Sequence, residues 1–171
     1  PAPPLPFDDD VELDWTPIWS LTHARWRYLP TSALYYDVPT PSHERVAVAD
    51  SNGCAAGATL ADAVVRALLE LIERDAVGIW WYNRLQRPAI SLDRRASPFM
   101  AAMDELYVAH GREFWCLDLT TDIGIPACAA VSRQRGDGGE RILMGFGAGL
   151  EMSDAAERAM MEMNQLLAAT D

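Results

Sequence analysis

The sequence is poor in the residues that most often build metal centres and nucleophile dyads. Three cysteines and three histidines occur among 171 residues. Cys54, Cys116 and Cys128 lie far apart with no CxxC spacing, which predicts buried free thiols in a reducing compartment. The histidines are isolated from one another, so the sequence contains no visible zinc-ligand pair and no Cys/His dyad.

Positive charge and long apolar runs are also scarce. Lys and Arg number 14 against 25 Asp and Glu, which gives a formal net charge of −11. Such a surface is not suited to nucleic acid or to anionic lipid, but a nucleotide can still bind together with a metal ion. No run of about 18 apolar residues and no signal-peptide pattern is present, so we expect a cytoplasmic protein without a membrane segment.

The composition that remains is that of a globular protein. Half of the residues are hydrophobic and 23% are charged, which predicts one domain over residues 1–171. Residues 1–14 are rich in proline and then in aspartate, so we expect them to form an exposed lead-in. The phosphate-binding pattern GxxxxGK[ST] does not occur.

Hydrophobic spacing and turn residues predict strands that alternate with helices. Helices are expected over 59–81, with Thr59 as N-cap, over 99–110, and over 154–169, with Ser153 as N-cap. This order predicts an α/β (α+β) fold in which mixed sheets are packed by helices. The expected strands cover residues 15–21, 28–36, 45–49, 113–119, 125–132 and 142–146.

An internal repeat is the most informative pattern. An offset of 92 residues lays segment 53–73 on segment 145–165 without a gap, and each segment runs from a Gly/Ala turn into a helix. The repeat predicts two copies of one strand–turn–helix unit. The identical pairs are Gly53/Gly145, Ala56/Ala148, Gly57/Gly149, Asp62/Asp154, Ala63/Ala155, Arg66/Arg158, Ala67/Ala159 and Glu70/Glu162.

The first repeated helix carries a polar stripe. Asp62, Arg66, Glu70 and Glu73 fall within an arc of about 80° at 3.6 residues per turn. Opposite them, an apolar side is expected to face the core; it consists of Val64, Leu68, Leu71 and Ile72.

The second repeated helix carries a matching stripe. Arg158, Glu162 and Gln165 lie on one side, while Met160, Met163 and Leu167 face away from it.

These stripes have two interpretations. They are solvated faces with i,i+4 ion pairs worth ~0.3 kcal/mol each, or they form a metal–phosphate site. Paired carboxylates suit Mg²⁺, and arginines suit phosphate oxygens.

Two runs resemble the YcaO family. Residues 51–60 read SNGCAAGATL, close to the family pattern SNGxAAGNTxEEA, and residues 70–76 carry its ExxERDA block. The final helix resembles the closing A…RAxxExxQ helix, and the resemblance covers nearly the whole chain. It implies an α/β fold built on repeated units that binds ATP and Mg²⁺.

The implied chemistry is ATP-dependent activation of a peptide backbone amide. In azoline-forming members, a Cys, Ser or Thr side chain of the substrate adds to the preceding amide carbonyl, and ATP phosphorylates the resulting oxygen, which leaves as phosphate. The resemblance therefore implies a cyclodehydratase of thiazole/oxazole-modified microcin or bacteriocin biosynthesis. Thioamide formation, macroamidine formation and a non-catalytic nucleotide-binding scaffold remain alternatives.

Site residues follow from the resemblance position by position, although no catalytic residue is assigned. Glu70, Glu73 and Glu162 would bind Mg²⁺. The residues that would bind the nucleotide are Ser51, Asn52, Asp62, Arg74, Arg158 and Gln165.

Ala58 departs from the family pattern, which has Asn there, and the family's earlier SxxxE helix is not found upstream of Trp15. We therefore expect a fragment that lacks the N-terminal part of the domain and is inactive alone. The implied partners are a precursor peptide and a ThiF-like leader-binding protein or fused domain. A homodimer is left open.

Overall fold

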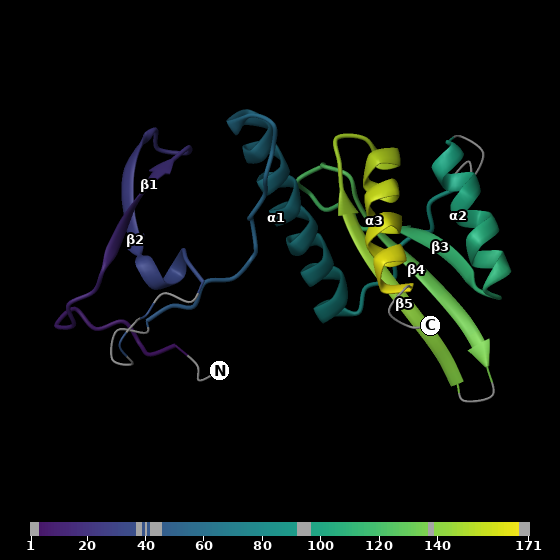
Figure 1. Cartoon of the computed structure of the whole chain (residues 1–171), viewed down its shortest axis with the longest axis horizontal. Coiled ribbons are helices and arrows are strands. Elements are labelled where there is room, and N and C mark those ends of the chain that lie inside the picture. Colours follow the sequence, from purple (N-terminus) through teal and green to yellow (C-terminus); the bar gives the residue numbers. More distant parts are fainter. Residues whose placement is uncertain are drawn as a thin grey trace. The chain divides into compact units, whose positions relative to one another are not determined.

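The computed structural model describes residues 4–36, 39, 41, 46–91, 97–136 and 139–167 (Figure 1). The chain divides into two compact units, Pro1–Ser51 and Asn52–Asp171, and each is described by itself. Within the part of the chain that the structure describes, no helix is both long and apolar enough to cross a membrane.

The first unit is built on a β-hairpin. β1 (Trp15–Ser20) pairs antiparallel with β2 (Arg25–Pro30), and a short 3-10 helix, η1 (Thr31–Ala33), follows. The second strand lies earlier in the sequence than the predicted range 28–36, because the turn at residues 21–24 brings the chain back sooner. β2 then ends at Pro30, because the chain turns into η1, although Thr31 N–H still donates to the Asp14 carbonyl at 2.8 Å.

The second unit contains a three-stranded sheet. Its order is β3 (Glu113–Asp118), β4 (Ala127–Gly136) and β5 (Gly139–Ala148), and both pairings are antiparallel. The expectation of mixed sheets is wrong for the described strands, because their connections are too short for a parallel crossover. The strand predicted over 45–49 is also not found: residues 46–49 form no strand, and Arg45 lies outside the described residues.

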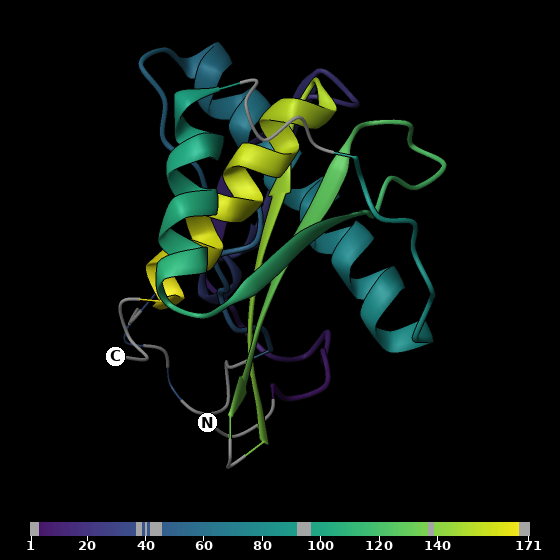
Figure 2. The same cartoon turned by 90° about the vertical axis from the view of Figure 1, so that its right-hand side faces the viewer.

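Helices cover both faces of this sheet (Figure 2). Side chains alternate along β4, so that Cys128 and Ala130 face α2 (Pro98–Ala109) and α3 (Met152–Leu167). On the opposite face, Ala127 and Ala129 pack against α1 (Leu60–Asn83). The small side chains of β4 let both helix layers approach closely.

The two repeated helices begin at equivalent residues. The Thr59 hydroxyl accepts a hydrogen bond from Asp62 N–H at 3.1 Å, which confirms Thr59 as the N-cap of α1. Ser153 was predicted to cap α3 but lies inside that helix. Instead, the carbonyl of Glu151 accepts the first helical bond, from Ala155 N–H at 3.1 Å. Glu151 is the residue that the 92-residue offset pairs with Thr59.

Equivalent glycines allow each turn to lie against its helix. A Cβ on Gly57 would lie 2.4 Å from the Ala63 nitrogen. A Cβ on Gly149 would lie 2.9 Å from the nitrogen of Ala155, the residue equivalent to Ala63. The repeat seen in the sequence is therefore also a repeat of geometry.

Burial confirms the predicted core face of α3 but changes that of α1. Met160, Met163 and Leu167 are buried as expected. In α1, Ile72 is buried, but Leu68 and Leu71 are exposed by 53% and 46%; Leu69 and Ala76 are buried instead. Cys116 and Cys128 are buried free thiols, whereas Cys54 is exposed, contrary to expectation.

Candidate functional site at the edge of β5

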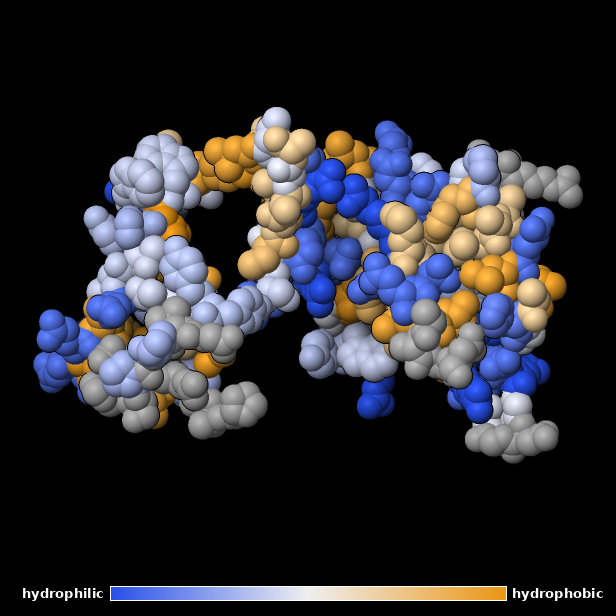
Figure 3. All heavy atoms as spheres, in the orientation of Figure 1, coloured by the Kyte–Doolittle hydropathy of each residue, from blue (hydrophilic) through white to orange (hydrophobic). Residues whose placement is uncertain are grey.

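The outer edge of β5 is where the acidic stripes of α1 and α3 meet. Successive N–H groups of a strand point to opposite sides, so those of Phe146 and Ala148 share one side. Phe146 N–H donates to Glu162 Oε2 on α3 at 2.5 Å. Ala148 N–H donates to the Glu73 carboxylate on α1. Helices on opposite faces of the sheet thus each place a carboxylate at the same strand edge. Figure 3 shows hydrophilic residues between α1 and α3.

Glu70 is the third carboxylate of this cluster. It accepts a hydrogen bond from the backbone N–H of Gly53, whose φ of +76° suits glycine. Its other oxygen pairs with Arg74 Nε at 3.0 Å. Glu70 and Glu162 match under the 92-residue offset, and each is held by a backbone N–H that precedes its own helix.

Glu73 is partly buried beside other charged side chains. Burial raises the pKa of Glu73 from its ordinary value of 4.5 to about 7, and the negative charges of Glu162 and Glu70 act in the same direction. Arg74, 3.9 Å away, only partly opposes them. Like charges gathered in a half-buried place would be stabilised by a bound cation.

The cluster fits Mg²⁺ by the chemistry of its donors. Mg²⁺ prefers oxygen ligands and retains several waters, so two or three carboxylates are sufficient. Each glutamate accepts one peptide N–H, which leaves further lone pairs on its two oxygens. Nevertheless, no three acidic, His or Cys side chains in the described ranges are arranged as a metal-binding group.

Asp62 and the arginines lie at the N-terminal end of the α1 stripe. Asp62 Oδ1 pairs with Arg66 Nε at 2.9 Å, and Asp62 Oδ2 accepts Ala58 N–H at 3.0 Å. These contacts hold the pKa of Asp62 below its usual value, chiefly through the Arg66 hydrogen bond, and the charge of Arg158 contributes. Arg158 on α3 is thus close enough to act on α1. The Asp62 side chain also caps the N-terminus of α1 by accepting a backbone N–H, as the third helical residue of a capping box does.

Two of the three remaining predicted residues lie on the exposed surface of the second unit. Gln165 is exposed near the end of α3, and Asn52 is exposed in the turn before Gly53. Ser51 belongs to the first unit, so its position relative to the glutamates is not described.

One residue that positions the site was missed by the sequence analysis. A Cβ on Gly147 would lie 2.3 Å from the Ala155 carbonyl oxygen and 2.8 Å from Arg158 Cβ. The glycine therefore allows the Arg158 turn of α3 to lie directly on β5. Its signal in the sequence is a glycine inside a strand, which often marks a close backbone approach.

Comparison with known proteins places this chain in one family. A sequence model described as "YcaO cyclodehydratase, ATP- and Mg²⁺-binding" matches residues 1–171. A heterocyclase in complex with substrate and cofactor is 46% identical, with a TM-score of 0.89 over 95% of this chain. The heterocyclase TruD is 44% identical, with a TM-score of 0.86 over 97%.

A third similar structure is YcaO from Methanopyrus kandleri, bound with AMPPCP and Mg²⁺. It is 24% identical with a TM-score of 0.75 over 97% of this chain, and it supports the fold alone. The chain covers 22%, 24% and 44% of these three chains, respectively, and thus spans less than half of each.

Proposed function

Because this chain belongs to the YcaO cyclodehydratase family, we propose that it contributes to ATP- and Mg²⁺-dependent activation of a peptide backbone amide. The reaction would be cyclodehydration of Cys, Ser or Thr to a thiazoline or oxazoline in a ribosomally made precursor. The observation that carries this proposal is the approach of Glu73 on α1 and Glu162 on α3 to the same edge of β5, with Glu70 three residues before Glu73 on α1.

The three glutamates would hold Mg²⁺. Their carboxylates come from two helices on opposite sheet faces, and the peptide N–H groups of Gly53, Phe146 and Ala148 orient them. Such preorganisation lowers the cost of gathering negative charge when the cation binds. Glu73 would lose its proton on binding, because a bound cation would oppose the burial and the negative charges of Glu162 and Glu70 that raise its pKa.

The arginines would bind phosphate oxygens. Arg74 is held by Glu70 at the cluster, and Arg158 approaches from α3. Ser51, Asn52 and Gln165 would add polar contacts to the nucleotide, whereas Asp62 would act indirectly by holding Arg66 and the start of α1. Bound Mg²⁺–ATP would supply the phosphoryl group for the amide oxygen. These residues would hold the nucleotide, and the arginines would neutralise the negative charge of its phosphates.

The peptide and its carrier are part of the same proposal. A similar heterocyclase is described in complex with substrate, and a structurally similar E. coli microcin synthetase is described as an McbBCD complex. We expect a precursor peptide and a ThiF-like leader-binding protein or domain. Thioamide or macroamidine formation would use the same glutamates, and the mass of the product distinguishes these reactions from azoline formation.

Calorimetry with Mg²⁺–ATP tests the site. It should be carried out on the full-length gene product that contains this chain, with Glu70→Gln, Glu73→Gln and Glu162→Gln variants. Each variant should weaken binding at least tenfold, because one oxygen ligand and one negative charge are lost. Glu105→Gln on the exposed side of α2 is the matched control and should bind like the wild type. Unchanged affinity in all three site variants would contradict the proposal.

A further inference from the structure

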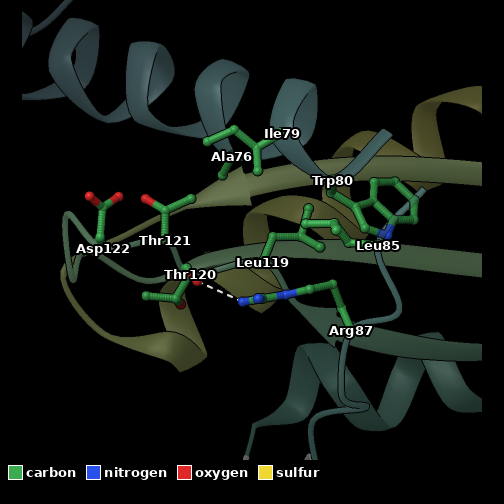
Figure 4. Close-up of a pocket in the computed structure, with 9 residues that line it drawn as sticks. All are labelled: Ala76, Ile79, Trp80, Leu85, Arg87, Leu119, Thr120, Thr121 and Asp122. Atoms are coloured by element: carbon green, nitrogen blue, oxygen red, sulfur yellow. Dashed lines mark hydrogen bonds between the residues drawn. The ribbon is translucent and has the colours of Figure 1, made fainter. Parts of the chain in front are cut away.

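A separate hollow lies at the C-terminal end of α1, where Figure 4 shows its lining side chains. Its volume is about 210 Å³. Its walls come from the last turns of α1, from the segment that follows α1, and from the β3–β4 connection. The proposed magnesium and phosphate contacts use none of these lining residues.

The base of the hollow and its α1 side are apolar and well supported. Ala76 and Leu119 are buried at 1% and 2% exposure, so the base rests on the core. Ile79 and Trp80 form the α1 side, and the Trp80 ring is held edge-on against Phe146 with their ring centres 6.4 Å apart. These contacts keep the apolar wall in place when the hollow is empty.

Arg87 fixes the opposite wall. Its Nε donates to the Asp118 carbonyl at 2.7 Å, and one Nη donates to the Thr120 carbonyl at 2.6 Å. The guanidinium thus ties the segment after α1 to the β3–β4 connection. That connection brings Thr121 and Asp122 to one end of the hollow, as Figure 4 shows, so polar groups border an apolar interior.

The size of the hollow decides what class of ligand it can take. Sites for whole small molecules usually measure about 300–1,000 Å³, so this hollow by itself is too small for a complete nucleotide. It fits one large apolar side chain. A polar border is appropriate for the backbone of a peptide that inserts such a side chain.

The position also favours a peptide. Ala76 follows Glu73 by three residues on α1, about 4.5 Å along the helix axis. A larger hollow of about 450 Å³ adjoins this one, because Trp80 and Leu85 line both. An extended peptide points alternate side chains to one side, so a single peptide can place two side chains against the shared Trp80 and Leu85.

We propose that the hollow between Ile79, Trp80 and Leu119 is a specificity pocket for the peptide substrate, and that it accepts a large apolar side chain near the modified residue. This inference rests on the proposed function. It adds a preference for aromatic or large aliphatic residues at one substrate position, and it places the neighbouring substrate backbone beside the Glu73 turn of α1.

Fluorescence anisotropy with short labelled peptides tests the pocket. The probes are Gly-Xaa-Gly-Cys-Gly peptides in which Xaa is Gly, Leu or Phe, titrated with the full-length gene product in the presence of Mg²⁺ and a non-hydrolysable ATP analogue. The Leu or Phe peptide should bind at least tenfold more tightly than the Gly peptide. Ile79→Trp and, independently, Thr121→Trp fill the hollow and should bring that ratio close to one. Val108→Trp, at an exposed position of α2, is the control and should keep the preference.

Calorimetry with Mg²⁺–ATP on the same proteins separates the two proposals. If nucleotide binds but the three peptides bind equally, or none binds, the pocket inference is wrong and the proposed function stands. If Ile79→Trp weakens nucleotide binding and leaves the peptide preference intact, the hollow holds the nucleotide base and the inference is overturned. Absence of nucleotide binding by the wild type would contradict the proposed function itself.

Discussion

At the scale of single residues, the raised pKa of Glu73 predicts that the free energy of unfolding depends on pH. Its pKa is about 7 in the folded chain and near 4.5 when exposed, so folding favours the protonated form. The resulting stabilisation is present below pH 4.5 and is lost as the pH rises towards and through 7. In EDTA, the free energy of unfolding of the wild type should fall by about 2–3 kcal/mol relative to Glu73→Gln between pH 4.5 and 8.

Urea unfolding at several pH values measures this difference. Glu105→Gln, at an exposed position of α2, should follow the wild type across the whole range. A Glu73→Gln curve parallel to that of the wild type would show that the carboxyl is not perturbed by its neighbours.

At the scale of the elements, the close packing of α3 on β5 is expected to depend on Gly147. In Gly147→Ala, the added Cβ would meet the Ala155 oxygen at 2.3 Å and the Ala159 nitrogen at 2.6 Å. Both are backbone atoms, so α3 must move, and the free energy of unfolding should fall by about 1–3 kcal/mol. Mg²⁺–ATP affinity should fall as well, because Arg158 and Glu162 move with α3.

Gly136→Ala is the matched control, since nothing lies within 4 Å of its added Cβ. Urea denaturation followed by circular dichroism compares the two variants. Equal losses of stability would mean that the close approach at Gly147 is not what positions α3.

The extent of the helices could be predicted from the sequence, but their packing could not. The extent of α1 was predicted within two residues, because Thr59 provides an N-cap and the apolar spacing is helical. The buried side of α1 could not be predicted, because Leu68 and Leu71 are as apolar as Leu69 and Ile72. Which leucines are buried depends on how α1 packs against the sheet. The spacing of Glu70, Glu73 and Glu162 was visible in the sequence, but the approach of Glu73 and Glu162 to one edge of β5 depends on tertiary packing.

At the scale of the whole molecule, the core belongs to one of the two units. Every buried residue in the described ranges lies in Asn52–Asp171, where one cluster packs under α2 and α3 and the other under α1. The first unit has a two-stranded hairpin, and such a hairpin is marginally stable alone in water. Cooperative folding should therefore reside in the second unit.

A polypeptide of residues 52–171 tests this assignment. We expect it to unfold in one cooperative transition, with a urea midpoint close to that of the whole chain, because both hydrophobic clusters are retained. Residues 1–51, measured alone, should show no such transition. If residues 52–171 instead lose their near-ultraviolet circular dichroism, the first unit must supply packing on which the core depends. The proposed site at the edge of β5 would then require the first unit as well.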